Sequence, residues 1–284
     1  MRQMLVTRAM VIITLGLCGM ASAQWNKQII DQSGNAGYTP TIKVDLQGVP
    51  HVAYIKDGAL YHGKWNGSSW NPVYVAGDSY AKCASIAHGI IGTTPVTALA
   101  SLQGHSYVRQ MSNGYQIWYE TWYLLYAKII LSERSGPYTE LSNLIYHSPT
   151  SPAMGLPWIE IVIAGDILHC VYFYYGQPLH IQYNLRTKQW LESPSIDNVV
   201  TGAAVKCSLT ADASGNLHLS YFDQADWDLK YAYYNGTAWN SQYIDTGNVG
   251  EWNSIVIRNG KPHIFYNCYD DTWTTSSLKH AEMN

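Results

Sequence analysis

Residues 216–245 read NLHLSYFDQADWDLKYAYYNGTAWNSQYID, and residues 49–75 read VPHVAYIKDGALYHGKWNGSSWNPVYV. Each stretch contains His-x-x-Tyr, then Leu-x-Tyr or Leu-x-His in a second run, then Asn-Gly-x-x-Trp at the start of a third run. The same motifs recur in the same order. The chain is therefore expected to be built from structural repeats, and its fold has to be argued from the repeat unit.

The spacing of the motif histidines gives the size of the unit. His169, His218 and His263 lie 49 and 45 residues apart. His51 and His169 lie 118 residues apart, which suits two units only if one of them holds an insertion. The expected insertion is about residues 101–123, a stretch that has no counterpart elsewhere in the chain.

Each unit alternates runs of four to eight β-favouring residues with turn residues, and no stretch keeps a helical period for long. The runs predict four strands per unit. Asn66-Gly67 and Asn235-Gly236 predict type I′ hairpins between the third and fourth strands. A four-stranded unit of this length is the size of a β-propeller blade, so the expected fold is all-β.

The two ends of the chain predict how many blades there are. The last run, residues 278–284, matches a third strand, while residues 24–31, QWNKQIID, match the fourth strand AWNSQYID at 238–245. A fourth strand supplied by the N-terminal segment would close a ring of five blades and cover the open sheet edge. The expected blades span residues 32–78, 79–148, 149–197, 198–245 and 246–284 of a single domain.

The first 23 residues have the layout of a secretory signal peptide. Arg2 and Arg8 precede an apolar run, and Ala21-Ser22-Ala23 forms a small-residue cleavage site before Gln24. A lipid anchor at Cys18 is disfavoured because Leu17 occupies the place of a small residue. No other run approaches the ~20 apolar residues of a spanning helix, so we expect a secreted protein, extracellular or periplasmic, with no membrane span.

Charge and composition narrow the choice of partners. The chain has 17 basic and 20 acidic residues, and removing the leader would take away two basic residues and no acidic one. A nucleic-acid partner is therefore not expected. The 23 Tyr and 11 Trp far outnumber the 3 Phe, a bias toward aromatic rings that carry a polar group and suit wet binding faces.

Four cysteines follow the leader, and they fall on four different segments of the repeat map. Disulfide-bonded Cα atoms must lie within ~7 Å of each other, so buried free thiols are expected, with disulfides as the alternative in a secreted protein. The four are Cys83, Cys170, Cys207 and Cys268.

The motifs Gly-Asn-x-His at 215–218, Leu-Lys-Tyr-Ala at 229–232 and Asn-Gly-x-x-Trp resemble blades of bacterial secreted propeller-repeat proteins, broadly those with sialidase-type (BNR) repeats. Five-bladed closure is also similar to tachylectin-like sugar-binding propellers and to five-bladed glycoside hydrolases, by architecture alone. The Asp of the sialidase Asp-box is replaced by Trp65 or Tyr234, and no arginine triad lies on the expected inner strands. The resemblance therefore implies a propeller and not a sialidase activity.

The regularly repeated His, Tyr and Trp residues are interpreted as blade packing. Four motif histidines on equivalent strands would lie far apart around a ring, whereas zinc ligands must converge on one ion. We therefore predict no metal site and no cofactor.

Residues that break the repeat are the better candidates for function, because sites on a scaffold usually lie in its loops. Trp and Tyr stack on sugar rings and carboxylates accept hydroxyl hydrogens, so the predicted ligand is a glycan or another cell-surface ligand. The alternative is that these side chains cover blade tops or a protein partner. The predicted binding residues are Trp118, Trp122, Trp158, Asp226, Trp227, Trp252, Asp271 and Trp273.

A second hypothesis is a glycoside hydrolase or lyase. Glu160 takes an inner-strand place that Thr41, Ser208 and Ser254 hold in other units. In the second unit the register is ambiguous, because matching Cys83 to Cys207 and matching Ser85 to Ser208 differ by one residue. A catalytic pair would need a further carboxylate such as Asp228, ~5 to 9.5 Å away. Because that partner would lie on a loop, a non-catalytic lectin-like module is the preferred hypothesis, with Glu160 as a satisfied polar residue.

Overall fold

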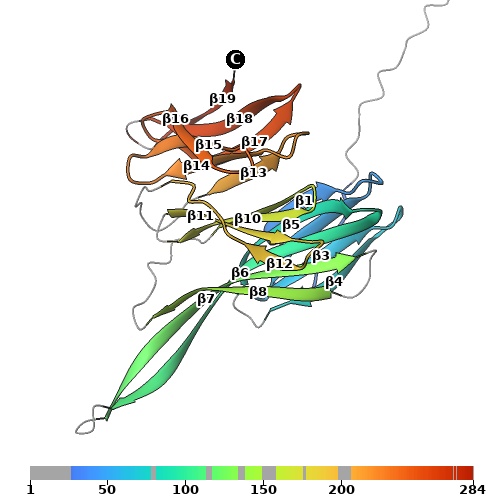
Figure 1. Cartoon of the computed structure of the whole chain (residues 1–284), viewed down its shortest axis with the longest axis vertical. Helices are drawn as coiled ribbons and strands as arrows, with labels where there is room; N and C mark the ends of the chain where they lie inside the picture. Colours follow the sequence, from blue (N-terminus) through green and yellow to red (C-terminus); the bar gives the residue numbers. More distant parts are fainter. Residues whose placement is uncertain are drawn as a thin grey trace, which may run out of the picture.

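A computed structural model of the chain describes residues 27–77, 81–112, 117–133, 138–148, 158–174, 177–197, 206–270, 272 and 274–283. These residues form strands β1 to β19 and no helix, in five antiparallel sheets (Figure 1). The described part is therefore all-β and holds no helix that could cross a membrane. Its five sheets match the five predicted blades.

The sheets follow one another along the chain, and we number them as blades 1 to 5. Blade 1 holds β1 (Tyr38–Val44), β2 (Pro50–Lys56), β3 (Ala59–Trp65) and β4 (Trp70–Ala76). Blade 2 holds β5 (Ala81–Ile91), β6 (Thr94–Ser112), β7 (Ile117–Glu133) and β8 (Tyr138–Ser148). Blade 3 holds β9 (Ile159–Ala164), β10 (Ile167–Tyr174), β11 (Gln177–Asn184) and β12 (Gln189–Leu191).

Blade 4 holds β13 (Cys207–Ala211), β14 (Leu217–Asp223), β15 (Asp228–Tyr234) and β16 (Trp239–Asp245). Blade 5 has three strands, β17 (Val249–Arg258), β18 (Lys261–Tyr269) and β19 (Ser276–Glu282). Residues 27–31 form no strand, and residues 24–26 lie outside the described part. The predicted fourth strand of blade 5 therefore stays a prediction.

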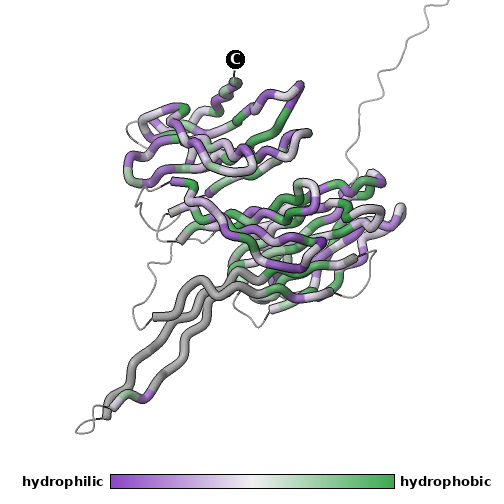
Figure 2. Tube along the Cα trace, in the orientation of Figure 1, coloured by the Kyte–Doolittle hydropathy of each residue, from purple (hydrophilic) through white to green (hydrophobic). Residues whose placement is uncertain are grey.

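The core lies between neighbouring sheets. The first strands pack on one another in chain order, from β1 through β5, β9 and β13 to β17. Each His-x-x-Tyr strand pairs with its first strand in the same register, as in Ser208 opposite Ser220 and Glu160 opposite Val171. Hydrophobic and hydrophilic residues alternate along the strands (Figure 2), as expected for sheets that pack face to face.

Two hairpins differ from the prediction. Asn66 and Asn235 do not have the positive φ that the first residue of a type I′ turn requires. Instead, the Asn66 side-chain oxygen accepts the amides of Ser68 and Ser69 and closes a four-residue loop. The local side-chain hydrogen bonds replace the tighter turn. Positive φ at both central residues occurs instead at Asp57-Gly58, which joins β2 to β3, and at Asn259-Gly260, which joins β17 to β18.

The stretch predicted as an insertion lengthens β6 and β7 into a long hairpin. Its paired residues run out to Ser112 opposite Ile117. In Figure 1 this hairpin projects well beyond the other blades. The added residues therefore continue the ladder between the second and third strands of blade 2.

An Asp–Tyr–Lys group recurs at blades 1, 4 and 5. In each group an Asp carboxylate accepts the hydroxyl of the motif Tyr and also binds a Lys amino group of the same blade. The groups are Asp31 with Tyr54 and Lys56, Asp197 with Tyr221 and Lys230, and Asp245 with Tyr266 and Lys279. Asp245 ends β16 and Asp197 follows β12, so these two clamp the end of one blade to the next blade.

The four cysteines are free thiols. Cys83, Cys170 and Cys207 are buried, and Cys268 is half-buried. Burial raises the pKa of Cys83 to about 12, which keeps it a neutral thiol. The free-thiol expectation is confirmed for these residues.

Candidate functional site

The first strands of blades 3, 4 and 5 each present one side chain at the same register position. Trp158 lies two residues before Glu160, Lys206 two before Ser208, and Trp252 two before Ser254. Glu160, Ser208 and Ser254 each face the third residue of their motif strand. We call Ser85, Trp158, Glu160, Lys206 and Trp252 the inner-strand cluster.

Glu160 is the centre of this cluster. Its Oε2 accepts the hydroxyl of Ser85 at 3.0 Å, and its Oε1 accepts the indole N–H of Trp158 at 3.2 Å. Burial raises the pKa of Glu160 to about 7, although Lys43 and the two hydrogen bonds act in the opposite direction. The carboxyl group therefore exchanges its proton near neutral pH.

Ser85 settles the ambiguous register of blade 2. Its hydroxyl oxygen accepts the amide of Ile161 at 3.1 Å, just as the hydroxyl oxygen of Ser208 accepts the amide of Ile255 at 3.2 Å. Both serines therefore hold the first strand of the following blade. Ser85 is therefore the counterpart of Ser208, and the register that matches Cys83 to Cys207 is wrong.

Lys206 lies between two tryptophans. Its Nζ is positioned over the ring of Trp252 and lies 5.1 Å from the ring centre of Trp158. Burial lowers the pKa of Lys206, while Glu251 acts in the opposite direction. Trp252 is 56% exposed, so this cation–π pair opens to solvent.

The backbone around Lys206 is held from two sides. Its carbonyl accepts the amide of Phe222 and the side-chain amide of Asn253, each at 3.3 Å. Asn253 in turn accepts the buried hydroxyl of Ser220 at 2.6 Å. The lysine therefore sits on a fixed support.

Lys206 and Glu251 were not among the predicted site residues. The repeat alignment contained the signal for Lys206, because it holds the place that Trp158 and Trp252 hold in the neighbouring units. Only aromatic and acidic residues were predicted to bind the ligand, so the lysine at the equivalent position in blade 4 was missed.

The predicted acidic residues of blade 4 have structural partners. Asp226 accepts the hydroxyl of Tyr243 at 3.0 Å. Asp228 is buried and accepts the amide of Gly247 at 2.8 Å. No hydrogen bond or ion pair among the described residues joins Asp228 to Glu160.

Trp227 lies in the loop between β14 and β15, and its carbonyl accepts the amide of Val249 at 3.0 Å. This contact brings the loop beside the start of β17, the strand that carries Trp252. Gly250 allows the approach, because its φ is +88° and an added Cβ would lie 2.8 Å from that of Leu229. Trp227 is itself largely exposed.

The remaining predicted binding residues lie partly or wholly outside the described part of the chain. Trp118 and Trp122 lie on β7, opposite Met111 and Tyr107, and their side chains lie outside the described part. Asp271 and Trp273 also lie outside the described residues.

The motif histidines form pairs within blades. Nitrogen atoms of His51 and His62 lie 2.8 Å apart, and those of His169 and His180 lie 3.1 Å apart. Both pairs are stacked and buried. Among the described residues, no three His, Cys, Asp or Glu side chains converge as ligands of a metal ion would.

No protein-family model matches the chain, and no curated protein matches its sequence. Solved structures do match. The SapL1 lectin, solved with α-methyl fucoside, has a TM-score of 0.50 and 10% identity over 88% of this chain and 83% of the lectin. A sialidase from Trypanosoma rangeli has a TM-score of 0.43 and 12% identity over 88% of this chain.

A GH43_1 enzyme from Xanthomonas citri has a TM-score of 0.42 and 13% identity, with 87% of this chain and 88% of the enzyme covered. The chain covers only 55% of the Trypanosoma rangeli sialidase. At these identities a likeness shows the fold alone. The five sheets and the similarity to the SapL1 lectin identify the fold as a β-propeller.

Proposed function

We propose that this protein is a secreted, non-catalytic carbohydrate-binding module that uses the inner-strand cluster. The observation that carries the proposal is the exposed Trp252 beside Lys206, because it places a stacking ring next to an ammonium group. The same ammonium group lies 5.1 Å from the ring centre of Trp158, which donates to Glu160. A sugar ring stacks on the face of Trp252 that Lys206 leaves open. Its hydroxyls then bind the ammonium and carboxyl groups.

The proposal also includes the closure of the ring and the secretion of the protein. The five blades form a closed ring, with residues 24–31 as the fourth strand of blade 5. Cleavage after Ala23 releases the mature domain outside the cytoplasm. The bound glycan belongs to a cell surface or to extracellular material, and the similarity of the SapL1 lectin supports a sugar ligand over a protein one.

The experiment is a glycan-array screen of the mature chain, followed by substitution of Trp252. We expect Trp252→Ala to weaken glycan binding at least tenfold, or ~1.4 kcal/mol, while the melting temperature stays nearly unchanged. The reason is that an exposed ring contributes little to the core.

Two tryptophans serve as matched controls. Trp190 is also exposed but lies on the outer strand β12, so Trp190→Ala is expected to leave binding intact. Trp239 is buried, and Trp239→Ala is expected to cost roughly 3 to 5 kcal/mol of stability. If Trp252→Ala destabilises the protein as much as Trp239→Ala, Trp252 is a packing residue and the proposed site is wrong.

One observation favours a hydrolase as the second candidate. Burial raises the pKa of Glu160 to about 7, which suits a general acid at neutral pH. A glycosidase also needs a second carboxylate, and the predicted partner Asp228 is engaged with the amide of Gly247. Glu251, beside Lys206, is the alternative partner.

A further inference from the structure

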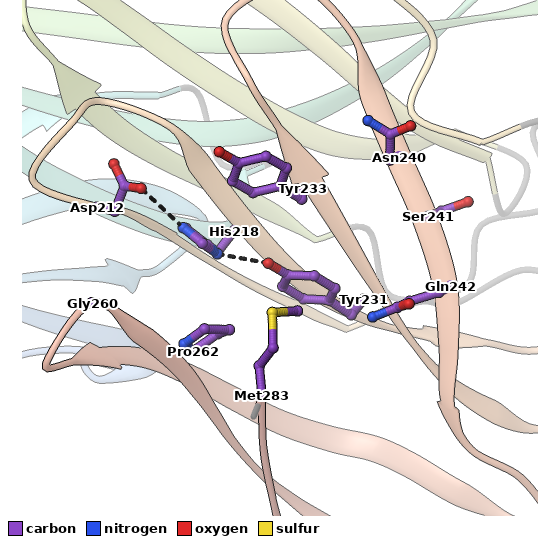
Figure 3. A pocket seen from close by; sticks show the side chains of 10 residues that line it. All are labelled: Asp212, His218, Tyr231, Tyr233, Asn240, Ser241, Gln242, Gly260, Pro262 and Met283. Carbon is purple, nitrogen blue, oxygen red and sulfur yellow. Dashed lines mark hydrogen bonds and ion pairs between the residues drawn. The ribbon is translucent and has the colours of Figure 1, made fainter.

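A cavity of about 380 Å³ lies between blades 4 and 5 (Figure 3). Blade 4 lines it with Tyr231 and Gln242, and blade 5 lines it with Pro262 and Met283. We propose that this cavity is the socket for the side chain of Trp25, carried by the chain's own N-terminal segment. The inference deepens the ring closure proposed above and rests on it.

Blade 4 shows how a fourth-strand tryptophan packs. Trp239 begins β16 and packs against Tyr234 of its own blade, with ring centres 5.1 Å apart. It also meets His180 of blade 3 edge-on, and its indole N–H donates to His180 Nδ1 at 3.1 Å. A fourth-strand tryptophan is thus held between its own blade and the preceding one.

Tyr231 is the blade 4 counterpart of His180. His180 pairs with Val171, and Tyr231 pairs with Ser220. Val171 and Ser220 are each the third residue of a His-x-x-Tyr motif. The residue that would receive a blade 5 tryptophan from the preceding blade is therefore Tyr231, which lines the cavity.

Met283 is the blade 5 counterpart of Tyr234. Tyr234 pairs with Leu217, the residue before the motif His218. The amide of Met283 donates to the carbonyl of Pro262, the residue before the motif His263. Both walls of the tryptophan site of blade 4 thus have counterparts in the lining of the cavity.

Trp25 is the residue that we expect between these walls, because it stands at the same distance from a clamping Asp as Trp239 does. Trp239 precedes Asp245 by six residues, and Trp25 precedes Asp31 by six. Asp31 clamps Tyr54 of blade 1 as Asp245 clamps Tyr266 of blade 5. The segment before Asp31 therefore belongs to the blade that precedes blade 1 in a ring, which is blade 5.

The polar groups of the cavity suit an indole N–H. His218 Nε2 lies 3.5 Å from the Asp212 carboxylate, which favours a proton on Nε2, so Nδ1 accepts the hydroxyl of Tyr231 at 2.7 Å. Both contacts are drawn in Figure 3. The Tyr231 oxygen then keeps an acceptor position for the Trp25 N–H, as His180 does for Trp239.

The outer faces of blades 1 and 5 form the rest of the interface. Ile42 of β1 is 60% exposed, whereas its register counterpart Leu209 is buried against blade 3. Phe265 and Leu278 of blade 5 are 45% and 79% exposed, whereas Ser220, the counterpart of Phe265, is fully buried. These two apolar faces are the halves of one blade-to-blade contact, and docking them places residues 24–31 along β19.

The test is hydrogen exchange of β19 (Ser276–Glu282) in the mature chain, residues 24–284, without any sugar present. We expect the β19 amides that do not pair with β18 to be protected in the parent protein. Trp25→Ala is expected to speed their exchange at least tenfold, and Gln28→Ala, on the same segment, is expected to leave it unchanged. Tyr231→Phe, which removes only the acceptor, is expected to speed it less, and to add little in the Trp25→Ala background.

Light scattering on the same samples shows whether the segment that protects β19 comes from the same chain or from a second copy of the protein. A protected β19 in a monomer supports the own-chain socket, whereas protection found only in a dimer assigns the strand to a second copy and overturns the proposal. Unprotected outer amides of β19 in the parent protein also overturn it. Because no glycan is involved, failure of the proposed sugar site would leave this result untouched.

Discussion

At the scale of single residues, Glu160 shows how one substitution in a repeat changes its chemistry. Its counterparts Ser208 and Ser254 carry hydroxyl groups, which stay neutral at every physiological pH. Glu160 instead carries a half-buried carboxyl group held by Ser85 and Trp158, and desolvation raises its pKa to about 7. Glu160 is therefore the strongest candidate for a catalytic residue, and substituting it is the most direct test for catalysis.

The double change Glu160→Gln with Asp228→Asn distinguishes binding from catalysis. In a binding module we expect glycan affinity to stay within about tenfold, or ~1.4 kcal/mol, and aryl glycosides to remain uncleaved by parent and variant alike. Asp226→Asn, which removes a neighbouring structural carboxylate, is the control for general disturbance of blade 4. Hydrolysis by the parent that disappears in the double variant would contradict the non-catalytic proposal.

At the scale of the elements, stacked histidine pairs join the second and third strands of several blades. Burial lowers the pKa of His62 and of His180 to about 3, and that of His169 to about 4. His88 of β5, which meets His51 edge-on and belongs to no stacked pair, also has its pKa lowered by burial to about 4. In the unfolded chain these histidines titrate near their ordinary value of 6.5. The pairs therefore hold the strands together as neutral rings.

This difference predicts that the fold weakens in mild acid. Between pH 6.5 and pH 4 these histidines are protonated in the unfolded chain but stay neutral in the folded protein. The free energy of unfolding therefore falls as pH falls, by up to about 1.4 kcal/mol per pH unit for each such histidine. We expect the melting temperature to drop steadily from pH 7 to pH 5, and the slope to be shallower in His169→Gln. A melting temperature that is constant over this range would show that the histidines are solvated and titrate normally.

At the scale of the whole molecule, the proposed ring closure would depend on the segment around Asp31. Asp31 accepts the hydroxyl and the amide of Ser33, the hydroxyl of Tyr54 at 2.8 Å and the amino group of Lys56 at 3.1 Å. These hydrogen bonds, those from Ser33 most of all, hold the pKa of Asp31 well below the usual range. The clamp ties the N-terminal segment to blade 1, and the closing strand would tie it to blade 5. A ring closed in this way would give blade 5 a fourth strand and cover the outer edge of β19.

Deleting residues 24–31 is expected to lower stability by several kcal/mol, because blade 5 loses a paired strand and blade 1 loses its clamp. Thermal melting of the mature and truncated chains measures the loss. Asp31→Asn, which weakens the clamp but keeps the strand, separates the two contributions and is expected to cost less. Equal melting temperatures for the truncated and mature chains would rule out closure by this segment.

The repeat in the sequence predicted the antiparallel sheets. The order His-x-x-Tyr, Leu-x-Tyr, Asn-Gly-x-x-Trp predicts four antiparallel strands per unit, because strand period and turn chemistry are local properties of the chain. Among the described residues blades 1 to 4 have four strands and blade 5 has three, so the closing strand stays a prediction. The same alignment placed Glu160 among the serines of the other first strands. The type I′ turns were wrong, since the Asn66 side chain captures backbone amides and closes a longer loop.

The candidate site depended on tertiary structure. Trp158, Lys206 and Trp252 are far apart in the sequence, and only the packing of blades 3, 4 and 5 brings the lysine between the two indoles. Asp226 and Asp228 looked like ligand groups in the sequence, yet the fold uses both as internal hydrogen-bond acceptors. A repeat pattern determines which strand a residue occupies, whereas its chemical role depends on the side chains that neighbouring blades place within a few ångströms of it.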